Sequence, residues 1–297
     1  MLDLFYTDHY ALPLPEGHRF PKDKYRLLRE ELSRDNRFRL HPAPLARPEI
    51  VALAHDAGYV RAFQEGTLGA AAMRKTGFPW SPELVDRTLA SVGGTLSAVE
   101  RARRAGFGGT LAGGTHHAFR GEGSGYCVFN DIVVAIAWAR EQGWARRFAV
   151  IDLDVHQGDG TASMCAGDET VMTVSVHGRN NFPFRKQRSA LDVELDDGAG
   201  DGEFLAGVGQ ALEHAGTVGA DMVFYQSGVD ALASDRLGKL CVTPQGMAAR
   251  DRMVFEWVRR RSVPVVVTMG GGYSEPIALT VAAHATTYRM AADVLDG

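Results

Sequence analysis

The chain has 297 residues, of which 45% are hydrophobic and 23% are charged, and its formal net charge is −4 at pH 7. This is the composition of an ordinary globular protein, long enough to bury a large core. The slightly acidic balance is unlike the basic footprint of a nucleic-acid-binding protein. The longest apolar run, residues 132–139, is far shorter than the roughly 20 residues that a membrane-spanning helix needs.

The cysteines and the N-terminus indicate the compartment. Cys127, Cys165 and Cys241 form no CxxC pair, and their odd number argues against a disulfide framework. Residues 1–6 lack the basic segment followed by an apolar segment of a secretory signal peptide. We therefore expect a cytoplasmic protein that binds neither nucleic acid nor membrane.

Apolar runs rich in β-branched residues recur along the chain between helical patterns. Continuously apolar runs are typical of parallel strands that are covered on both faces. In chain order, strands are expected at residues 2–6, 110–112, 148–153, 170–176, 222–226 and 263–269.

Helices are expected between these strands, and three of them begin at a capping signal. The expected helices are 22–33, 82–104, 131–142, 244–260 and 275–295. The second follows Ser81-Pro82, the third follows Asn130 and ends at Gly143, and the fourth follows Thr243. Irregular loops are expected at residues 41–48, 178–190 and 196–202. The alternation predicts an α/β fold: a single domain over residues 1–297, with a mostly parallel central sheet and helices on both faces.

Acidic and imidazole groups follow two of the expected strands. Asp152, Asp154 and His156 are spaced two apart, and residues two apart in an extended chain point to the same side. Asp230 follows the strand at 222–226, and sites in such sheets form at the carboxyl ends of strands. Asp154, His156 and Asp230 would give Zn²⁺ three ligands and leave a position open, which is the catalytic arrangement. Fe²⁺ would suit the same ligands.

Two adjacent histidines, His116 and His117, follow a pair of glycines. Alone, such a pair is more often part of a loop. Beside a metal site, one imidazole can take a proton from water and one can give a proton to a leaving amine. Each needs a partner for its other nitrogen, and Asp152 and Asp159 are the acids available.

A tyrosine follows three glycines at the end of the last expected strand. Glycines permit a close approach of the backbone, so the hydroxyl of Tyr273 could reach a carbonyl oxygen opposite the metal. Alone, this Gly270–Tyr273 pattern is more often a loop. The role suggested for Tyr273 therefore depends on the segments that carry the metal ligands and the histidine pair.

The segments that carry the acids, the histidine pair and the tyrosine, taken together in their order along the chain, resemble the zinc-dependent histone deacetylase superfamily. This superfamily includes bacterial acetoin-utilisation proteins and acetylpolyamine amidohydrolases. The resemblance spans about residues 5–290 and is also carried by 17–25, 125–131 and 235–238. It is greatest to the class IV-like bacterial branch. It implies a single deacetylase domain with the arginase/deacetylase-like fold and a hydrolase that acts on linear amide bonds.

The resemblance also implies a role for each matching residue. Asp154, His156 and Asp230 would bind zinc. His116 and His117 would be the catalytic pair, with His117 as the general base. Asp152 would orient His116, Asp159 would orient His117, and Tyr273 would polarise the scissile carbonyl. Gly125, Tyr126, Phe182 and Leu237 would line the substrate tunnel, and a structural K⁺ would be held by Asp152, Asp154, His156, Ser175 and Val176.

The sequence departs from the family pattern at two places in the tunnel. Tyr126 stands where the family usually has Phe, which adds a hydroxyl to the wall. The loop at 178–190, which contains Phe182, differs from the common pattern.

Four functional readings follow. The first is a deacylase of N-acyl-lysine in proteins or peptides. The second is a small-molecule amidohydrolase, such as an acetylpolyamine deacetylase, which should show an acidic rim and a restricted entrance. Glu122 is an acid near the tunnel segment, although an acid at this position is more often an exposed loop residue. The third, an arginase-like dimanganese hydrolase, lacks acids at Gly158 and Leu232. The fourth, a non-catalytic binding module, should have lost site residues. The oligomeric state and the preferred acyl chain are not indicated.

Overall fold

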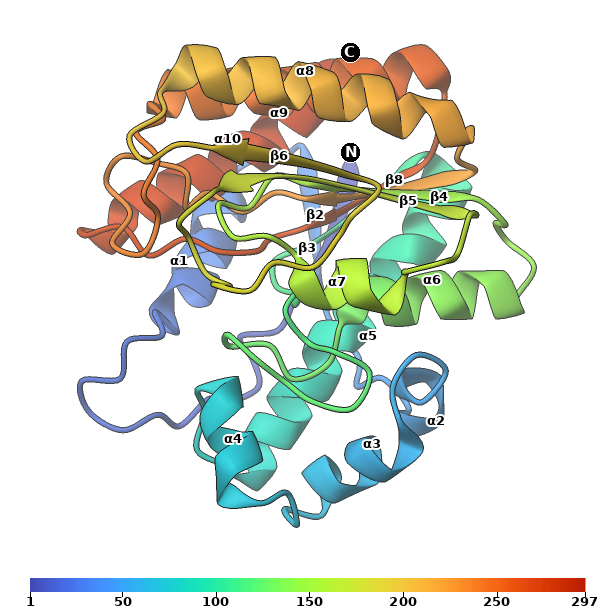
Figure 1. The fold of residues 1–297 in the computed structure, drawn as a ribbon, viewed down its shortest axis with the longest axis vertical. Coiled ribbons are helices and arrows are strands. Elements are labelled where there is room, and N and C mark those ends of the chain that lie inside the picture. Colours follow the sequence, from blue (N-terminus) through green and yellow to red (C-terminus); the bar gives the residue numbers. More distant parts are fainter. Residues whose placement is uncertain (297) are drawn as a thin grey trace.

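The computed structural model describes residues 1–296, and an eight-stranded parallel sheet forms its centre (Figure 1). The order across the sheet is β2-β1-β3-β8-β7-β4-β5-β6. The strands are β1 (Leu2–Tyr6), β2 (Phe38–Pro42), β3 (Phe107–Thr110), β4 (Phe148–Asp152), β5 (Val171–Gly178), β6 (Leu191–Leu195), β7 (Met222–Gln226) and β8 (Val265–Thr268). Because all neighbours are parallel, their carboxyl ends meet at one edge.

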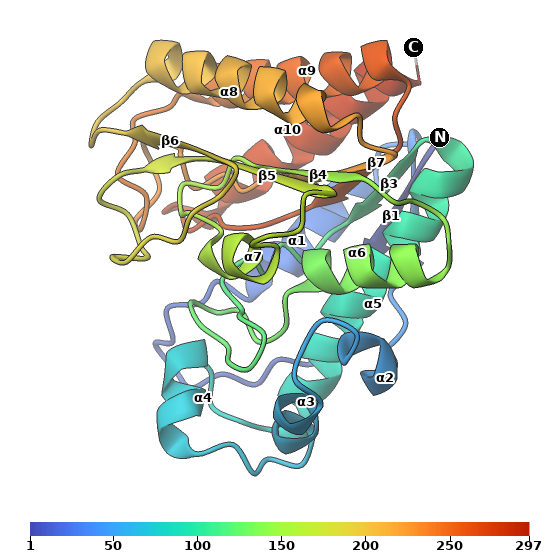
Figure 2. The same cartoon turned by 45° about the vertical axis from the view of Figure 1, so that its right-hand side comes forward.

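Helices cover both faces of the sheet (Figures 1 and 2). One face carries α8 (Asp201–Ala215), α9 (Pro244–Arg261) and α10 (Ile277–Leu295), and α1 (Asp23–Leu32) packs against α10. The other face carries α5 (Pro82–Ala105), α6 (Asp131–Glu141) and α7 (Asp159–Met164). Beyond α5 lie α2 (Pro48–Val51), α3 (Ala57–Gln64) and α4 (Ala70–Thr76), and a short 3-10 turn, Gly216–Val218, follows α8. The predicted α/β class with helices on both faces is confirmed.

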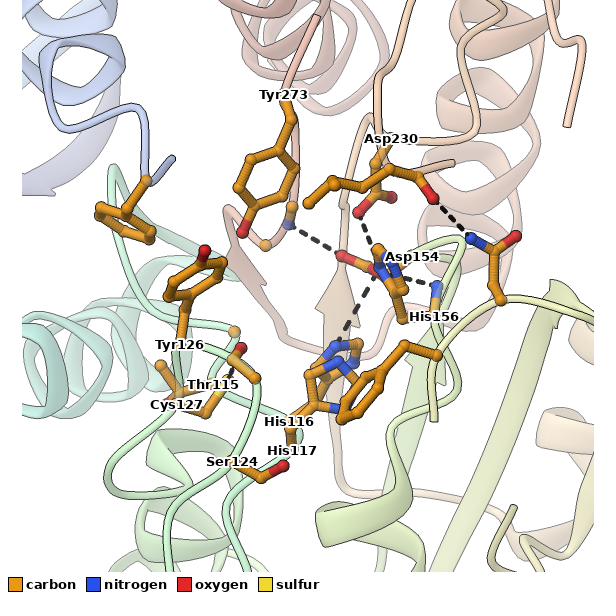
Figure 3. Close-up of a pocket in the computed structure, with 18 of the residues that line it drawn as sticks. Thr115, His116, His117, Ser124, Tyr126, Cys127, Asp154, His156, Asp230 and Tyr273 are labelled. Carbon is orange, nitrogen blue, oxygen red and sulfur yellow. Dashed lines mark hydrogen bonds and ion pairs between the residues drawn. The ribbon is translucent and has the colours of Figure 1, made fainter. Parts of the chain in front are cut away.

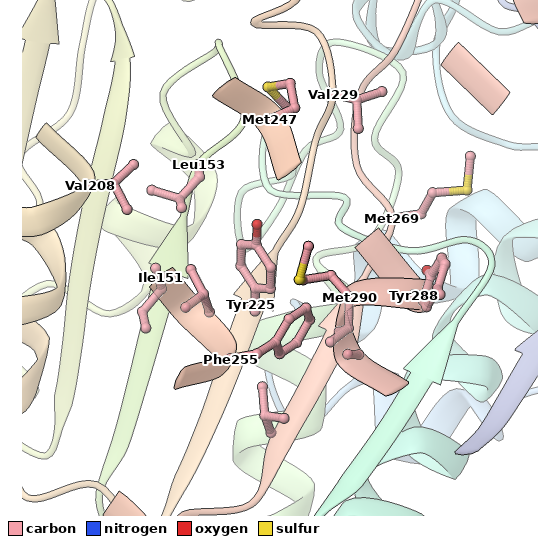
Figure 4. Close-up of a cluster of buried hydrophobic side chains, with 14 of the residues drawn as sticks. Ile151, Leu153, Val208, Tyr225, Val229, Met247, Phe255, Met269, Tyr288 and Met290 are labelled. Atoms are coloured by element: carbon pink, nitrogen blue, oxygen red, sulfur yellow. The ribbon is translucent and has the colours of Figure 1, made fainter. Parts of the chain in front are cut away.

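The main hydrophobic core lies between the sheet and the layer of α8, α9 and α10 (Figure 4). Ile151 and Tyr225 from the central strands meet Phe255 of α9 and Met290 of α10. Burying one such side chain contributes about 1.5–3 kcal/mol of transfer free energy. This core fixes the central strands, and therefore the segments that follow them.

The expected elements agree with the structure where they lie in the centre of the sheet. The five long strands are confirmed to within a few residues, and Ser81, Asn130 and Thr243 each accept the backbone hydrogen bond of a helix cap. The strand expected at 110–112 is Phe107–Thr110, since the chain leaves the sheet after Leu111 donates to the carbonyl of Phe5.

Each of the three expected loops overlaps a regular element; the loop expected at 178–190 overlaps β5 only at Gly178. Strand β2 occupies the start of 41–48, where Phe38–Pro42 pairs with β1. Helix α8 begins inside 196–202, because Glu203 accepts a hydrogen bond from the backbone of Gly200 and Asp201 lies in the first turn, where acidic groups stabilise a helix. Strands β2 and β6 and helices α2, α3, α4, α7 and α8 were not predicted.

No helix within residues 1–296 combines the length and the hydropathy that are required to cross a bilayer.

Candidate active site

Four neighbouring strands, β3, β8, β7 and β4, run into segments that carry the predicted site residues. These segments surround one pocket of about 610 Å³ at the carboxyl edge of the sheet. Figure 3 shows Tyr273, Asp230, Asp154 and His156 on one side of this space and the histidine pair below them. The topology therefore brings together residues that lie more than 150 positions apart.

The three predicted metal ligands form one buried cluster. One ligand atom from each of Asp154, His156 and Asp230 lies within 4.8 Å of the others. His156 Nδ1 is 3.0 Å from Asp154 Oδ1 and 3.1 Å from Asp230 Oδ2. The remaining carboxylate oxygens accept backbone hydrogen bonds, from Gly271 to Asp154 and from Val155 to Asp230. The cluster is thus held from behind, with the imidazole nitrogen turned towards both acids.

This donor set fits a divalent cation. One imidazole and two carboxylates are ligands that Zn²⁺ and Fe²⁺ accept, and the spacing is close to that required by bonds of about 2.0–2.2 Å. Burial and the neighbouring Asp154 carboxylate raise the pKa of Asp230 to about 7, so a cation would relieve the repulsion between the acids. Space is restricted, because a Cβ at Gly271 would lie 1.9 Å from Asp230 Oδ2.

Each histidine of the adjacent pair has its own carboxylate. His116 Nδ1 lies 2.7 Å from Asp152 Oδ2, and His117 Nδ1 lies 2.6 Å from Asp159 Oδ1. A carboxylate at Nδ1 holds the proton there and leaves Nε2 for the pocket. The two rings are 4.1 Å apart between centroids. The structure therefore brings each histidine together with the acid that was expected to orient it, and the orienting roles stay predictions.

The environments of the two imidazoles differ. Burial would lower the pKa of His116, but the charges of Asp152 and Asp154 outweigh it and raise this pKa to about 9. Burial and the charge of His116 lower the pKa of His117 to about 4, although Asp159 opposes this. His116 is therefore protonated and His117 is neutral near pH 7. This is the difference that a general acid and a general base require.

Tyr273 lines the pocket opposite Tyr126, with 6.2 Å between the ring centroids. Its backbone N–H donates to Asp235 Oδ2 at 2.6 Å. Within residues 1–296, its hydroxyl makes no hydrogen bond. The hydroxyl is therefore available to a ligand.

The predicted tunnel residues Gly125, Tyr126, Phe182 and Leu237 all line the same pocket. Phe182 packs edge-on against the His117 ring at 4.9 Å. A Cβ at Gly125 would lie 2.8 Å from His117 and 3.0 Å from Phe182, so glycine is required for this approach. Leu237 is partly exposed.

The residues expected to hold K⁺ lie together where β4 and β5 pair. Asp152 is directly opposite Ser175 in the register. The Ser175 hydroxyl is 2.9 Å from Nδ1 of His177, and Asp152 Oδ1 accepts from the backbone of Asp154. The potassium site stays a prediction.

Lys24 and Asp235 are two further residues at the site for which the sequence predicted no role. Lys24 is buried, lines the pocket and donates to the carbonyls of Gly270 at 3.2 Å and Gly272 at 3.4 Å. Burial lowers its pKa to about 8, against the opposing charges of Asp230 and Asp154. A sequence signal existed for Lys24, because it shares the buried stripe of α1 with residues four and eight positions later.

Comparison with known proteins gives a consistent result. The model of the histone deacetylase domain matches residues 18–289. The chain is 42% identical over 295 residues to an uncharacterized protein of Picosynechococcus sp., covering 97% of this chain and 98% of that protein. It is 34% identical to histone deacetylase 2 of Arabidopsis thaliana over 64% of this chain and 50% of that protein.

Solved structures show the same fold. The crystal structure of the HD domain of HDA15 aligns with a TM-score of 0.81 at 19% identity, covering 100% of this chain and 91% of that one. The acetylpolyamine aminohydrolase of Burkholderia pseudomallei aligns with a TM-score of 0.78 at 17% identity, covering 99% of each chain.

Proposed function

The chain belongs to the histone deacetylase family and is a hydrolase of amide bonds, and on this premise we propose that it is a zinc-dependent deacylase of N-acyl-lysine in proteins or peptides. The observation that carries the proposal is the meeting of three groups in one pocket. These groups are the Asp154–His156–Asp230 cluster, the two carboxylate-bound histidines and the free Tyr273 hydroxyl.

The side chains have complementary tasks in amide hydrolysis. A divalent ion bound by Asp154, His156 and Asp230 would lower the pKa of a coordinated water and polarise the substrate carbonyl. His117, neutral and held by Asp159, is suited to accept the proton of the attacking water at Nε2. His116, held in its protonated form by Asp152, is suited to give a proton to the leaving amine.

Tyr273 would stabilise the negative charge that develops on the carbonyl oxygen. Its hydroxyl has no partner among residues 1–296, so donation to the substrate breaks no existing hydrogen bond. Gly125, Tyr126 and Phe182 would enclose the aliphatic chain that leads to the amide, in the manner of an apolar pocket with few polar groups.

The pocket lining favours a lysine side chain over a free polyamine. A substrate with several positive charges would be bound best by an acidic rim. Asp154 and Asp230 supply the carboxylates of the lining, and both belong to the metal cluster. Lys75 and Lys239 lie at the mouth, and Glu122 is paired with Lys75 at 2.5 Å. A small acylated amine remains the second candidate because of the shared fold with the aminohydrolase.

Several accompanying assignments form part of this proposal. Fe²⁺ could replace Zn²⁺ at the cluster, since the ligands suit both. A structural K⁺ would bind beside Asp152 and Ser175, where β4 and β5 pair. We place the enzyme in the cytoplasm, where its free cysteines Cys127, Cys165 and Cys241 would remain reduced.

The test is an assay of zinc-loaded protein on fluorogenic peptides with acetyl-lysine and longer acyl-lysines, with acetylated polyamines in parallel. We expect faster release from the peptides and loss of activity with a chelator. Preferred turnover of polyamines would replace the substrate assignment. Chelator-insensitive turnover would contradict the metal mechanism.

A further inference from the structure

Helix α9 carries an ion pair of two consecutive residues, Arg250 and Asp251, in the interior of the protein. The exposed fraction is 0% for Arg250 and 1% for Asp251. Taking two charges out of water is costly, and replacing a buried ion pair by apolar residues often leaves stability unchanged or raises it. Stability alone therefore does not account for this pair.

Three elements hold the Asp251 carboxylate. Its Oδ1 accepts hydrogen bonds from Nε and Nη2 of Arg250 at 3.1 and 2.8 Å, and from the hydroxyl of Tyr225 in β7 at 2.5 Å. Its Oδ2 accepts from the hydroxyl of Thr287 in α10 at 2.8 Å. Burial would lower the pKa of Arg250, but the charge of Asp251 and, more weakly, that of Asp230 outweigh it and raise this pKa. The guanidinium is therefore charged, and its carboxylate is fixed by a strand and a second helix.

Other N–H groups of Arg250 bind the segment that carries a metal ligand. After β7 the chain continues through Ser227 and Gly228 to Asp230. Buried carbonyls outside a sheet need other partners. Arg250 supplies them, since Nη2 donates to the carbonyl of Ser227 at 3.3 Å and Nη1 donates to the carbonyl of Gly228. A planar guanidinium presents its donors in a fixed geometry, so it determines the position of both peptide groups.

The backbone of Gly228 also packs against the other acid of the metal cluster. A Cβ at Gly228 would lie 2.2 Å from Asp154 Oδ2, an approach that only glycine permits. One residue later, Val229 donates its N–H to the carbonyl of Gly271 at 3.0 Å, and Gly271 donates to Asp154 Oδ2 at 2.8 Å. A shift of this segment would therefore change the separation of the Asp154 and Asp230 carboxylates.

We propose that Arg250 is a positioning residue for the metal cluster. Through the two carbonyls that it binds, it sets the distance between the carboxylates of Asp154 and Asp230 before a cation enters. These carboxylates repel each other, so a fixed backbone is needed to hold them at the spacing that a divalent ion requires. The inference rests on the proposed function for the identity of the ion, but the positions of the two acids can be measured without one.

Arg250→Lys is the decisive variant. It keeps the buried charge beside Asp251 but loses the fork geometry that binds both carbonyls. We expect its zinc dissociation constant, measured by competition with a chromophoric chelator, to rise about 10-fold, since losing a group that orients metal ligands typically costs about 10- to 100-fold in affinity. Arg250→Met, which removes both contacts, should reach the upper end of this range. If Arg250→Met does not fold, Arg250→Lys still decides.

Thr287→Val is the matched control. It removes one hydrogen bond from the same Asp251 carboxylate and leaves the contacts of Arg250 with the segment in place. It should therefore lower the melting temperature but leave the zinc dissociation constant within about 2-fold of the wild type. Unchanged zinc affinity in Arg250→Lys overturns the proposal. An equal loss in Arg250→Lys and Thr287→Val also overturns it, because both variants would then report general destabilisation.

Crystal structures of the metal-free wild type and Arg250→Lys separate this inference from the proposed function. We expect residues 227–230 to shift in the variant and the carboxylates of Asp154 and Asp230 to move apart. Identical positions would overturn the positioning role, and this comparison decides alone if the wild type takes up no zinc. A shift with weakened zinc binding, in a protein that hydrolyses no acyl-lysine peptide, would reject the proposed function and retain the positioning role.

Discussion

One carboxylate oxygen of Asp235 accepts a 2.6 Å hydrogen bond from the backbone N–H of Tyr273, so the tyrosine is positioned by an acid that does not face the substrate. The other oxygen accepts from the N–H groups of Leu237 and Gly238 at 2.8 and 3.0 Å. Asp235 therefore ties the Tyr273 loop to the Leu237 loop at the tunnel.

Substitution of Asp235 by Asn should reduce activity only because it changes the position of the loops that Asp235 holds. An amide cannot accept hydrogen bonds on both sides, so either the Tyr273 loop or the Leu237 loop is released. Because small misplacements of a reacting group can cost about 10²-fold, we expect kcat to fall by up to about 100-fold. Steady-state kinetics on an acetyl-lysine peptide would measure this. A change in KM with normal kcat would contradict the positioning role.

Removal of the Tyr273 hydroxyl should reduce kcat and leave the fold intact. The hydroxyl makes no hydrogen bond within residues 1–296, so Tyr273→Phe leaves no buried partner unsatisfied. Losing one oxyanion donor typically costs about 10²–10³ in kcat. Tyr10→Phe, away from the pocket, provides a matched control. Near-normal kcat in Tyr273→Phe would reject the assigned role.

Zinc should raise the melting temperature of the metal-free protein. The cluster of Asp154, His156 and Asp230 is preformed in the fold, and a ligand that binds only the native state at 100 times its Kd stabilises by about 2.7 kcal/mol. Asp230→Asn should abolish the zinc-dependent shift but still fold, since the amide oxygen can accept from Val155. Exposed Asp86→Asn should behave as the wild type. Thermal scans with and without zinc would detect the difference.

Protein stability should decline in mild acid because buried histidines are held neutral. His55 Nε2 accepts the backbone N–H of Asn130 at 2.8 Å, and Nδ1 faces the Arg120 carbonyl. Burial lowers its pKa to about 4. Between pH 6.5 and pH 4 the unfolded chain binds this proton more readily than the folded chain. The contribution is therefore complete above pH 6.5 and lost as pH falls to about 4.

The His55→Gln variant tests this pH dependence. It should have a smaller slope of stability against pH between 6.5 and 4, with the contribution of His55 amounting to at most about 3 kcal/mol. Urea unfolding at a series of pH values would give the slope, whatever the absolute stability of the variant. An unchanged slope would show that His55 does not titrate in this range. His177, whose pKa burial also lowers to about 4, should keep part of the slope.

The sequence predicted the centre of the sheet better than its edges. Strands β4, β7 and β8 are buried throughout and read as continuous apolar runs. The edge strands β2 and β6 are half-exposed and mix charged with apolar residues, so their pairing is determined by tertiary contacts that periodicity does not reveal.

The site residues also differ in how far the sequence could predict them. The ligands and histidines were recognisable because each follows a central strand. The role of Lys24 was not, because its partners Gly270 and Gly272 lie more than 240 residues away.

The loop at 178–190 should distinguish peptide from small-molecule substrates. It carries four basic residues and no acidic one, and Phe184, 86% exposed, lies at the pocket mouth beside Phe182. A peptide would cover the Phe184 ring, whereas a small acylated amine would pass it.

Phe184→Ala should therefore raise KM for acyl-lysine peptides about 10-fold, because partial burial of an aromatic ring is worth about 1.4 kcal/mol. The kcat should stay the same, since the described ring contact of Phe184 is with Phe182 and not with a residue of the metal cluster. Leu279→Ala, at an exposed apolar position of α10 outside the metal pocket, should change neither constant. With an acetylated diamine as substrate, Phe184→Ala should have no effect. Equal effects on both substrates would remove the rim argument for a peptide.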